Sequence, residues 1–270
     1  MEAVTFIFSE MVKPFLRWVG GKRWLWNIIS PEINRVFHDR YIEPFLGGGS
    51  IAISYMEELD KRGDYKKFIL GDANAKLVNT YEQIKNNVND VISELESIIN
   101  SKPDYYAVRT EFNKTREMNS RLAALFIWLN KHSFRGVYRE NKYGEFSTPR
   151  GLPIKQVYDE DNLRELSRLF QKYAEFRVAR FNEYKEDGLY YLDPPYVNTY
   201  DGYTTLGAVT SGDLNQFMES KPESTFLVSN NAEYNAPAHA MIITHKVIDE
   251  RMDPRANRNK SRHEYLYKVD

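Results

Sequence analysis

The sequence predicts an α/β fold in which an open, mostly parallel sheet carries an inserted lobe of helices. Short apolar runs alternate with segments of helical periodicity along the chain, which is typical of parallel sheets covered by helices. A buried run at 40–46 leads into Gly47-Gly48-Gly49-Ser50 and then a helical segment at 51–59, an order found in phosphate and dinucleotide loops. Residues from about 80 to 160 show no convincing strand.

The same patterns predict the individual elements. We expect helices at residues 21–29, 51–59, 77–99 with a break near 86–89, 103–134 and 163–173. Expected strands cover residues 40–46, 67–72, 176–181, 188–192, 225–229, 241–248 and 265–269, the last two as an antiparallel pair. Residues 1–80 and 160–270 would then form one domain, interrupted by a helical and loop-rich domain at 81–159.

The bulk composition is that of a globular protein. The chain has 270 residues, 42% hydrophobic and 28% charged, and it is long enough to bury a core. It contains no cysteine, which excludes disulfides, thiolate metal sites and cysteine nucleophiles. No apolar run approaches the roughly 20 residues of a membrane span. Residues 1–9 include Glu2 and lack a basic region, so we expect no signal peptide and a cytoplasmic location, in a bacterial or an infected host cell.

The net charge of −1 argues against a general affinity for nucleic acid, so any nucleic-acid site has to be a local patch. Residues 131–150 contain five basic and two acidic side chains, a charge of +3, and residues 251–262 contain five basic and one acidic, a charge of +4. Both segments are candidates for such a patch, although solvated surface loops have the same composition.

The motif Asp193-Pro194-Pro195-Tyr196 follows an apolar strand. Two successive prolines donate no backbone hydrogen bonds and stiffen the chain, so the Asp193 carboxylate and the Pro194 carbonyl are left as acceptors, with the Tyr196 ring nearby. An exocyclic amine is a poor nucleophile because its lone pair is delocalised into its ring. Acceptors on its hydrogens favour attack and stabilise the developing positive charge. Taken alone, the motif is explained equally well as a turn after a strand.

Two further clusters would lie near it, because open α/β sheets bind ligands at the carboxyl ends of their strands. Gly47 and Gly49 allow backbone to approach a ligand closely. Asp72 ends the next strand, where it suits ribose hydroxyls, although it could also cap the following helix. Near the start of the chain a glycine pair precedes Lys22, which could meet a carboxylate.

Together these motifs resemble the Dam-type family (D12 class, alpha group) of adenine-N6 DNA methyltransferases. The matching segments are residues 15–22 (Phe-Leu-Arg-Trp-Val-Gly-Gly-Lys), 43–50 (Glu-Pro-Phe-Leu-Gly-Gly-Gly-Ser), 129–130 (Leu-Asn), 134–139 (Phe-Arg-Gly-Val-Tyr-Arg), 144–149 (Gly-Glu-Phe-Ser-Thr-Pro) and 193–196. The resemblance implies a Rossmann-like methyltransferase sheet with an inserted target-recognition domain. It also implies methyl transfer from S-adenosylmethionine, released as S-adenosylhomocysteine, to adenine N6 in double-stranded DNA.

The resemblance assigns roles in the cleft. The cofactor-binding residues would be Trp18, Gly20, Lys22, Phe45, Gly47, Gly49, Asp72, Phe181 and Asp193. Among them Asp72 would hold the ribose and Phe181 would pack near the adenine of the cofactor, although the acid that usually precedes it is Arg180 here. Asp193, Pro194 and Tyr196 would be catalytic and grip a target adenine that has left the duplex stack.

The resemblance also assigns DNA contacts, to Arg17, Phe134, Arg135, Val137, Arg139 and Pro149. Phe134 would wedge into the duplex and Arg139 would read a guanine edge. Arg135 departs from the family, since many relatives carry a small amide there. The expected target is GATC or a related site. The expected partners are duplex DNA and, as a functional pairing, a restriction endonuclease, and the expected state is a monomer.

Two other functions stay open on the sequence alone. The tetrad at 193–196 serves any planar amine, so methylation of RNA or protein is an alternative. A catalytically silent nucleic-acid-binding relative is another. The intact tetrad and glycine turn argue against a silent binder, and the charged loop at 131–150 favours duplex DNA. No metal-ligand spacing occurs, so we expect no metal.

Overall fold

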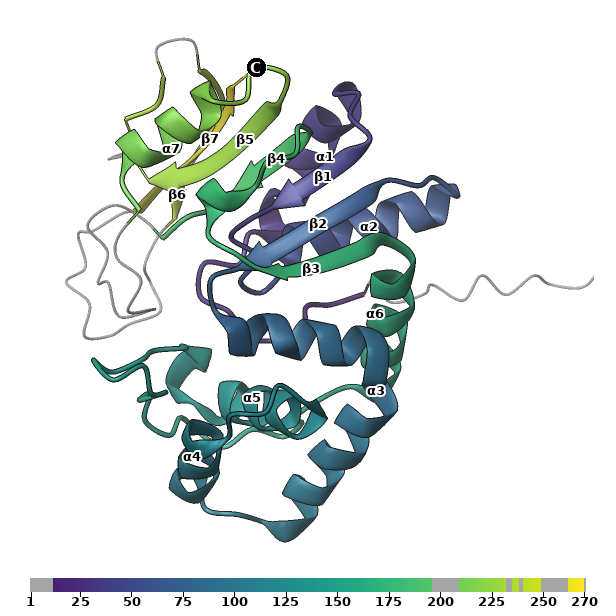
Figure 1. Cartoon of the computed structure of the whole chain (residues 1–270), viewed down its shortest axis with the longest axis vertical. Coiled ribbons are helices and arrows are strands. Elements are labelled where there is room, and N and C mark those ends of the chain that lie inside the picture. Colours follow the sequence, from purple (N-terminus) through teal and green to yellow (C-terminus); the bar gives the residue numbers. More distant parts are fainter. Residues whose placement is uncertain (1–11, 196–208, 232–234, 238–239, 249–261, 270) are drawn as a thin grey trace, which may run out of the picture.

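A computed structural model describes residues 12–195, 209–231, 235–237, 240–248 and 262–269 (Figure 1). Its strands form one seven-stranded sheet in the order β3-β2-β1-β4-β5-β7-β6. The strands are β1 (Arg40–Glu43), β2 (Lys67–Asp72), β3 (Ala174–Val178), β4 (Leu189–Leu192), β5 (Thr225–Asn231), β6 (Met241–Ile248) and β7 (Arg262–Val269). Strands β1 to β5 pair in parallel, whereas β7 runs antiparallel to β5 and β6. The expected open, mostly parallel sheet with a final antiparallel pair is confirmed.

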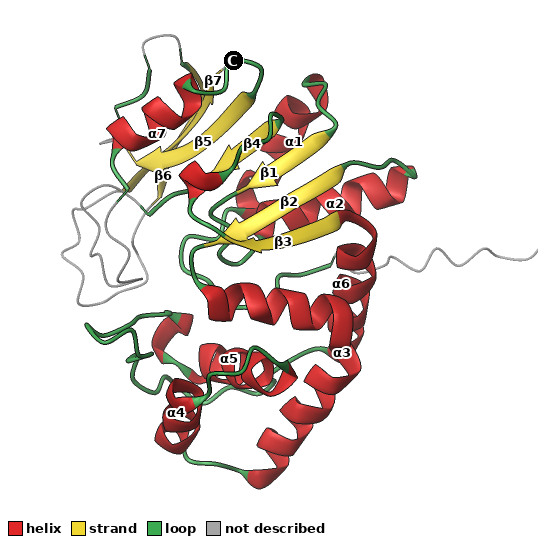
Figure 2. Ribbon diagram, in the orientation of Figure 1, coloured by secondary structure: helices red, strands yellow, loops and turns green. Residues whose placement is uncertain are grey.

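Helices cover both faces of this sheet (Figure 2). They are α1 (Trp26–Arg35), α2 (Ser50–Arg62), α3 (Ala75–Ser101), α4 (Tyr105–Lys114), α5 (Ser120–His132), α6 (Glu160–Tyr173) and α7 (Ser211–Glu219), with short 3-10 turns η1 (Arg23–Leu25), η2 (Phe134–Gly136) and η3 (Phe181–Glu183). In β4, Leu189 and Tyr191 join the larger core with α1 and α2, while Tyr190 and Leu192 join a smaller core with α7. Because both faces are buried, the strands are continuous apolar runs.

The helical lobe is attached to the sheet through α3. Asn87 (φ −137°, ψ 39°) breaks the helical geometry of α3, where the sequence predicts a break. The first part of α3 packs against the β3 edge, and the second part extends beside α5 (Figure 1). Residues 75–173 are all described, and none of them joins the sheet. The helix expected at 103–134 is instead two helices, because Asn119 caps a new helix at Ser120 by accepting from the Leu122 N–H.

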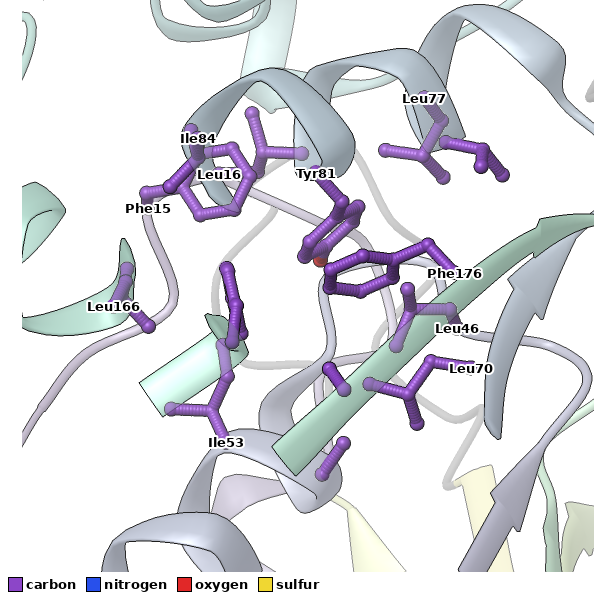
Figure 3. Close-up of a cluster of buried hydrophobic side chains, with 14 of the residues drawn as sticks. Phe15, Leu16, Leu46, Ile53, Leu70, Leu77, Tyr81, Ile84, Leu166 and Phe176 are labelled. Carbon is purple, nitrogen blue, oxygen red and sulfur yellow. The ribbon is translucent and has the colours of Figure 1, made fainter. Parts of the chain in front are cut away.

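A packed cluster lies where the lobe meets the sheet (Figure 3). Tyr81 of α3 lies between Phe15 and Phe176, with ring centroids 5.0 and 5.2 Å away. Its hydroxyl donates to the Gly47 carbonyl at 2.9 Å. The first helix of the lobe therefore supports the glycine turn directly.

Two strands end earlier than the sequence predicts. Strand β1 ends at Glu43 and not at residue 46, because Pro44 has no N–H to continue the ladder. Strand β3 ends at Val178, and Phe181 instead begins η3. Among the described residues, no helix has the length and apolar character needed to cross a bilayer.

Candidate active site

Four neighbouring parallel strands each deliver candidate residues at their carboxyl ends. In sheet order these are Phe181 after β3, Asp72 at the end of β2, Phe45 and Gly47 after β1, and Asp193 after β4. The parallel pairing of these strands puts their carboxyl ends on one edge of the sheet. The expected convergence of the strand-end motifs is therefore present.

Lys22 forms an ion pair with Asp193. Its Nζ donates to the two carboxylate oxygens at 3.2 and 3.3 Å and to the Gly20 carbonyl at 2.9 Å. Lys22 is 3% exposed, whereas the Asp193 side chain is 22% exposed. The expected contact between Lys22 and a carboxylate is thus observed, with Asp193 as its partner. The buried cation holds the orientation of a carboxylate that still reaches the solvent.

The glycine turn makes room for two aromatic rings. Gly47 and Gly49 have φ values of 47° and 63°, in the left-handed region that favours glycine. A Cβ on Gly47 would lie 2.6 Å from Trp18 Nε1, and a Cβ on Gly49 would lie 2.9 Å from the Tyr81 hydroxyl. The turn therefore needs glycine for packing, besides any approach of its backbone to a ligand. Gly20, with φ 85°, makes a similar turn beside Lys22.

Asp72 lies beside this turn and stabilises it. Its Oδ2 accepts from the Gly47 N–H at 3.1 Å, and its Oδ1 accepts from the Asn74 N–H at 2.9 Å. Burial raises the pKa of Asp72, and these backbone donors partly offset the rise. The cap of α3 is Asn74 and not Asp72, since the Asn74 side chain accepts from Lys76 and Leu77. With backbone donors from Gly47, Ala73 and Asn74, the carboxylate still has a lone pair for a ligand hydroxyl.

Phe45 and Phe181 form an aromatic pair beyond Asp72. Their rings stack at 5.4 Å with an interplanar angle of 26°, and both side chains are half-buried. In the same turn, Glu183 accepts from the Arg180 N–H at 3.1 Å. The two phenylalanines expected to line the cofactor site are thus brought together.

Glu43 is a buried acid for which the sequence predicts no role. It is 2% exposed and accepts from the Tyr41 hydroxyl at 2.8 Å. Burial, together with the negative charge of Asp193, raises the pKa of Glu43 to about 8, although the hydrogen bonds from Tyr41 and Ala52 oppose the rise. A charged residue between a buried apolar strand and Pro44 was the available signal. Burial therefore favours the protonated form of Glu43.

Residues 133–151 fold back on themselves as a hairpin, which we call the recognition hairpin. The Phe134 N–H donates to the Pro149 carbonyl at 2.9 Å, and the Ser147 N–H donates to the Arg139 carbonyl at 2.8 Å. Phe134 is 50% exposed, and the Arg135 guanidinium lies 5.3 Å from its ring centroid. The proposed DNA-contacting side chains Phe134, Arg135, Val137, Arg139 and Pro149 therefore share one hairpin.

The recognition hairpin contacts residues 15–22, the N-terminal motif, through residues for which the sequence predicts no role. Tyr138 stacks on Trp18 at 6.2 Å and 20°, and on Phe126 at 5.3 Å and 14°. Asn130, at the end of α5, bonds to the backbone of Arg17 and to the Gly136 carbonyl. The segment that carries Arg17, Trp18 and Lys22 therefore contacts both the hairpin and the sheet edge.

The model of D12 class N6 adenine-specific DNA methyltransferases matches residues 18–258. The chain belongs to this family. It is 32% identical over 233 residues to the Type II methyltransferase M.MjaIII of Methanocaldococcus jannaschii, covering 78% of each protein. It is 30% identical over 241 residues to the DNA adenine methylase of Haemophilus influenzae, covering 81% of this chain and 79% of that one. The DNA adenine methylase of Serratia marcescens is 32% identical over 191 residues, covering 68% and 67% respectively.

Membership in the D12 class decides among the alternatives left by the sequence. It supports an adenine-specific DNA methyltransferase over methylation of RNA or protein and over a silent binder. Tyr196 and nearly all of the basic segment at 251–262 lie outside the described residues. Among the described residues, no cluster of acidic or histidine side chains could hold a metal ion.

Proposed function

We propose that this D12-class enzyme transfers the methyl group of S-adenosylmethionine to N6 of an adenine flipped out of a short duplex site, GATC or a related sequence. The observation that carries this proposal is the Asp193 carboxylate, held by buried Lys22 at the end of β4 and next to the glycine turn. The chemistry needs a fixed acceptor at that place, because only a held acceptor stabilises charge as it develops.

The residues along the sheet edge fit S-adenosylmethionine. The stacked Phe45 and Phe181 rings suit its adenine, the Asp72 carboxylate suits its ribose, and the turn at Gly47 with Trp18 and Lys22 suits its methionine end. When bound, S-adenosylmethionine supplies an electrophilic methyl group on a cationic sulfur and leaves as S-adenosylhomocysteine. The left-handed Gly47 and the spare lone pair of Asp72 support this fit.

The protein acts on the amine of the target base. The Asp193 carboxylate accepts one N6 hydrogen and the Pro194 carbonyl accepts the other, which concentrates the lone pair on nitrogen. Methyl transfer would leave a positive charge on N6, which the Asp193 carboxylate would stabilise. The extra N6 proton then passes to the Asp193 carboxylate and on to solvent. By family likeness, the Tyr196 ring stacks on the base.

Residues 81–159 would serve as the target-recognition domain, and residues 1–80 and 160–270 as the catalytic domain. The exposed Phe134 would fill the gap left by the flipped base, and the exposed Arg139 would read guanine. Arg17 and Val137 would read an outer base pair. We further propose that the enzyme acts as a monomer and protects DNA from a companion restriction endonuclease. The Type II methyltransferase among its relatives supports the last point.

The test is methylation of a pool of duplexes with random sequence. The full chain is incubated with the pool and tritiated S-adenosylmethionine, the modified base is identified by mass spectrometry, and the site by sequencing. We expect N6-methyladenine within one short motif. Label in cytosine, label only in RNA, or no incorporation would overturn the proposal, and a motif unrelated to GATC would correct its site.

A further inference from the structure

Three asparagine side chains make the same contact with the backbone. Each amide accepts from the N–H and donates to the carbonyl of a single residue, as a neighbouring β-strand does. The pairs are Asn162 with Lys13 at 2.8 and 2.9 Å, Asn113 with Phe146 at 2.9 and 3.1 Å, and Asn130 with Arg17 at 2.8 and 2.8 Å. We call them backbone clamps.

The Asn130 clamp has a second partner. Its Nδ2 also donates to the Gly136 carbonyl at 3.1 Å, and Asn130 is only 3% exposed. The two backbones that it joins are in direct contact, since a Cβ on Gly136 would lie 2.5 Å from the Arg17 Cβ and 2.9 Å from the Arg17 carbonyl oxygen. One buried amide therefore fixes the recognition hairpin to the N-terminal motif.

Each backbone leads to a different part of the site. After Arg17 come Trp18, which packs on the glycine turn, and Lys22, which bonds to Asp193. Gly136 lies between Phe134 and Arg139 in the recognition hairpin. The Tyr138–Trp18 stack is a second contact between the same two segments.

We propose that Asn130 is a positioning residue for site discrimination. It sets the position of the recognition hairpin relative to Arg17 and to Asp193 at the sheet edge, without contacting DNA itself. Hydrogen bonds to base edges depend on position within a fraction of an ångström, and Arg17 and Arg139 have to meet the same short site together. This inference rests on the DNA contacts proposed above for those side chains.

Asn130→Asp tests the clamp with almost no change in shape. The aspartate keeps an acceptor for the Arg17 N–H but turns an oxygen toward the Arg17 and Gly136 carbonyls, which repel it. The measurement is kcat/KM on the preferred duplex divided by kcat/KM on a duplex with one outer base pair changed. We expect this ratio to fall about tenfold or more, chiefly through slower transfer on the preferred duplex.

Gly136→Ala is the second variant. The added methyl group pushes on Arg17 and strains the left-handed backbone of residue 136 (φ 69°), while the Asn130 amide remains. The same loss of discrimination is expected from it. If Asn130→Asp fails to give a sharp thermal melt, Gly136→Ala carries the test.

The other two clamps supply matched controls. Asn162→Asp makes the same chemical change on the same N-terminal segment, away from the recognition hairpin. Asn113→Asp makes it at Phe146, on the other arm of the hairpin, and leaves Arg17 alone. We expect the discrimination ratio to be that of wild type in Asn162→Asp and to change little in Asn113→Asp.

Fluorescence anisotropy on the same two duplexes separates this inference from the proposed function. If the wild-type chain does not methylate adenine, the proposed function fails. A duplex can then be selected from the random pool by binding. The ratio of the affinities for this duplex and for one with an outer base pair changed still tests Asn130. The inference would be overturned if folded Asn130→Asp or Gly136→Ala kept the discrimination ratio of the wild-type chain. An equal loss in either control clamp would overturn it as well.

Discussion

The sheet edge and the recognition hairpin hold their functional side chains in different ways. At the sheet edge the decisive groups are buried or fixed by buried partners, as in the Lys22–Asp193 pair and in Glu43. On the hairpin Phe134, Arg135 and Arg139 are exposed, and it is their backbone that is fixed.

This difference follows from the two tasks. Stabilising charge on an amine needs a held acceptor with little water around it. Reading base edges needs side chains that reach outward from a rigid frame. Substitutions at the sheet edge should therefore change rate, proton binding and stability, whereas substitutions on the hairpin should change site choice and leave the fold intact.

The largest expected effect is that of Asp193→Ala. The rate of methyl transfer should fall by about 10³-fold, within the range for a lost acid–base group. Affinity for S-adenosylhomocysteine should change far less. Single-turnover kinetics and calorimetry measure the two quantities.

Asp193→Ala also leaves the buried Lys22 without its carboxylate partner. The control is therefore the Asp193→Ala/Lys22→Met double variant, which should restore stability but not the rate of methyl transfer. A loss of cofactor affinity equal to the loss of rate would show that Asp193 serves binding and not transfer.

Glu43→Gln tests whether burial controls proton binding at the sheet edge. In the native state Glu43 titrates near pH 8, and its ordinary pKa is 4.5, so the native state binds the extra proton between these values. The free energy of unfolding therefore falls as pH rises through this window, by roughly a few kcal/mol. Glutamine is neutral throughout and should remove this part of the fall.

Chemical denaturation at pH 5, 7 and 9 measures the effect of Glu43→Gln. The variant should match wild type at pH 5 and exceed it at pH 9. Glu57→Gln, which removes a buried acid that is ion-paired with the exposed Lys61, is the control and should not flatten the profile. Parallel profiles for wild type and Glu43→Gln would mean that Glu43 is ionised in the native state.

The difference between buried and exposed parts of the molecule also explains which features the sequence predicts. The strands of the sheet were found because burial on both faces makes them apolar runs, and the strand-end motifs followed from the rule that ligands bind there. Strand β3 was expected to reach Phe181 because its apolar pattern continues past the last ladder pair at Val178. The pattern reports burial, not hydrogen bonding.

Other features depend on contacts between distant residues. Asn130 belongs to one of the segments that match the family. The sequence predicts no role for it, because its partner Arg17 is 113 positions away. The proton on Glu43 depends on the packing of Tyr41, Ala52 and Asp193 around it. A single sequence shows neither contact.

Arg139→Ala tests the hairpin side of the comparison. Discrimination at one guanine should fall by about 1–3 kcal/mol, the usual worth of a bidentate arginine contact. The melting temperature should not change, because the side chain is exposed. The ratio of kcat/KM between the preferred site and its variant at that base pair is the measurement. Arg150→Ala, another exposed arginine of the hairpin, is the control and should weaken binding to both duplexes alike.

The smallest expected effect is that of Arg135→Asn, at a strained position of the hairpin. Arg135 has φ 57° and ψ 15°, a left-handed conformation that asparagine tolerates better than arginine. At the sheet edge, Gly47 and Gly49 have such values. Asparagine should raise the free energy of unfolding by about 1 kcal/mol or less. It should also weaken DNA binding and lower its salt dependence by about one released ion.

Arg135→Ala separates the two consequences, because alanine also removes the guanidinium but gives no asparagine-like relief of strain. Both variants should bind DNA equally weakly, and only Arg135→Asn should melt above wild type. Equal melting temperatures for the two variants would show that the left-handed backbone carries no cost here. The hairpin would then differ from the sheet edge only in the exposure of its functional side chains. No contact between Arg135 and DNA would be needed to offset a cost of its backbone conformation.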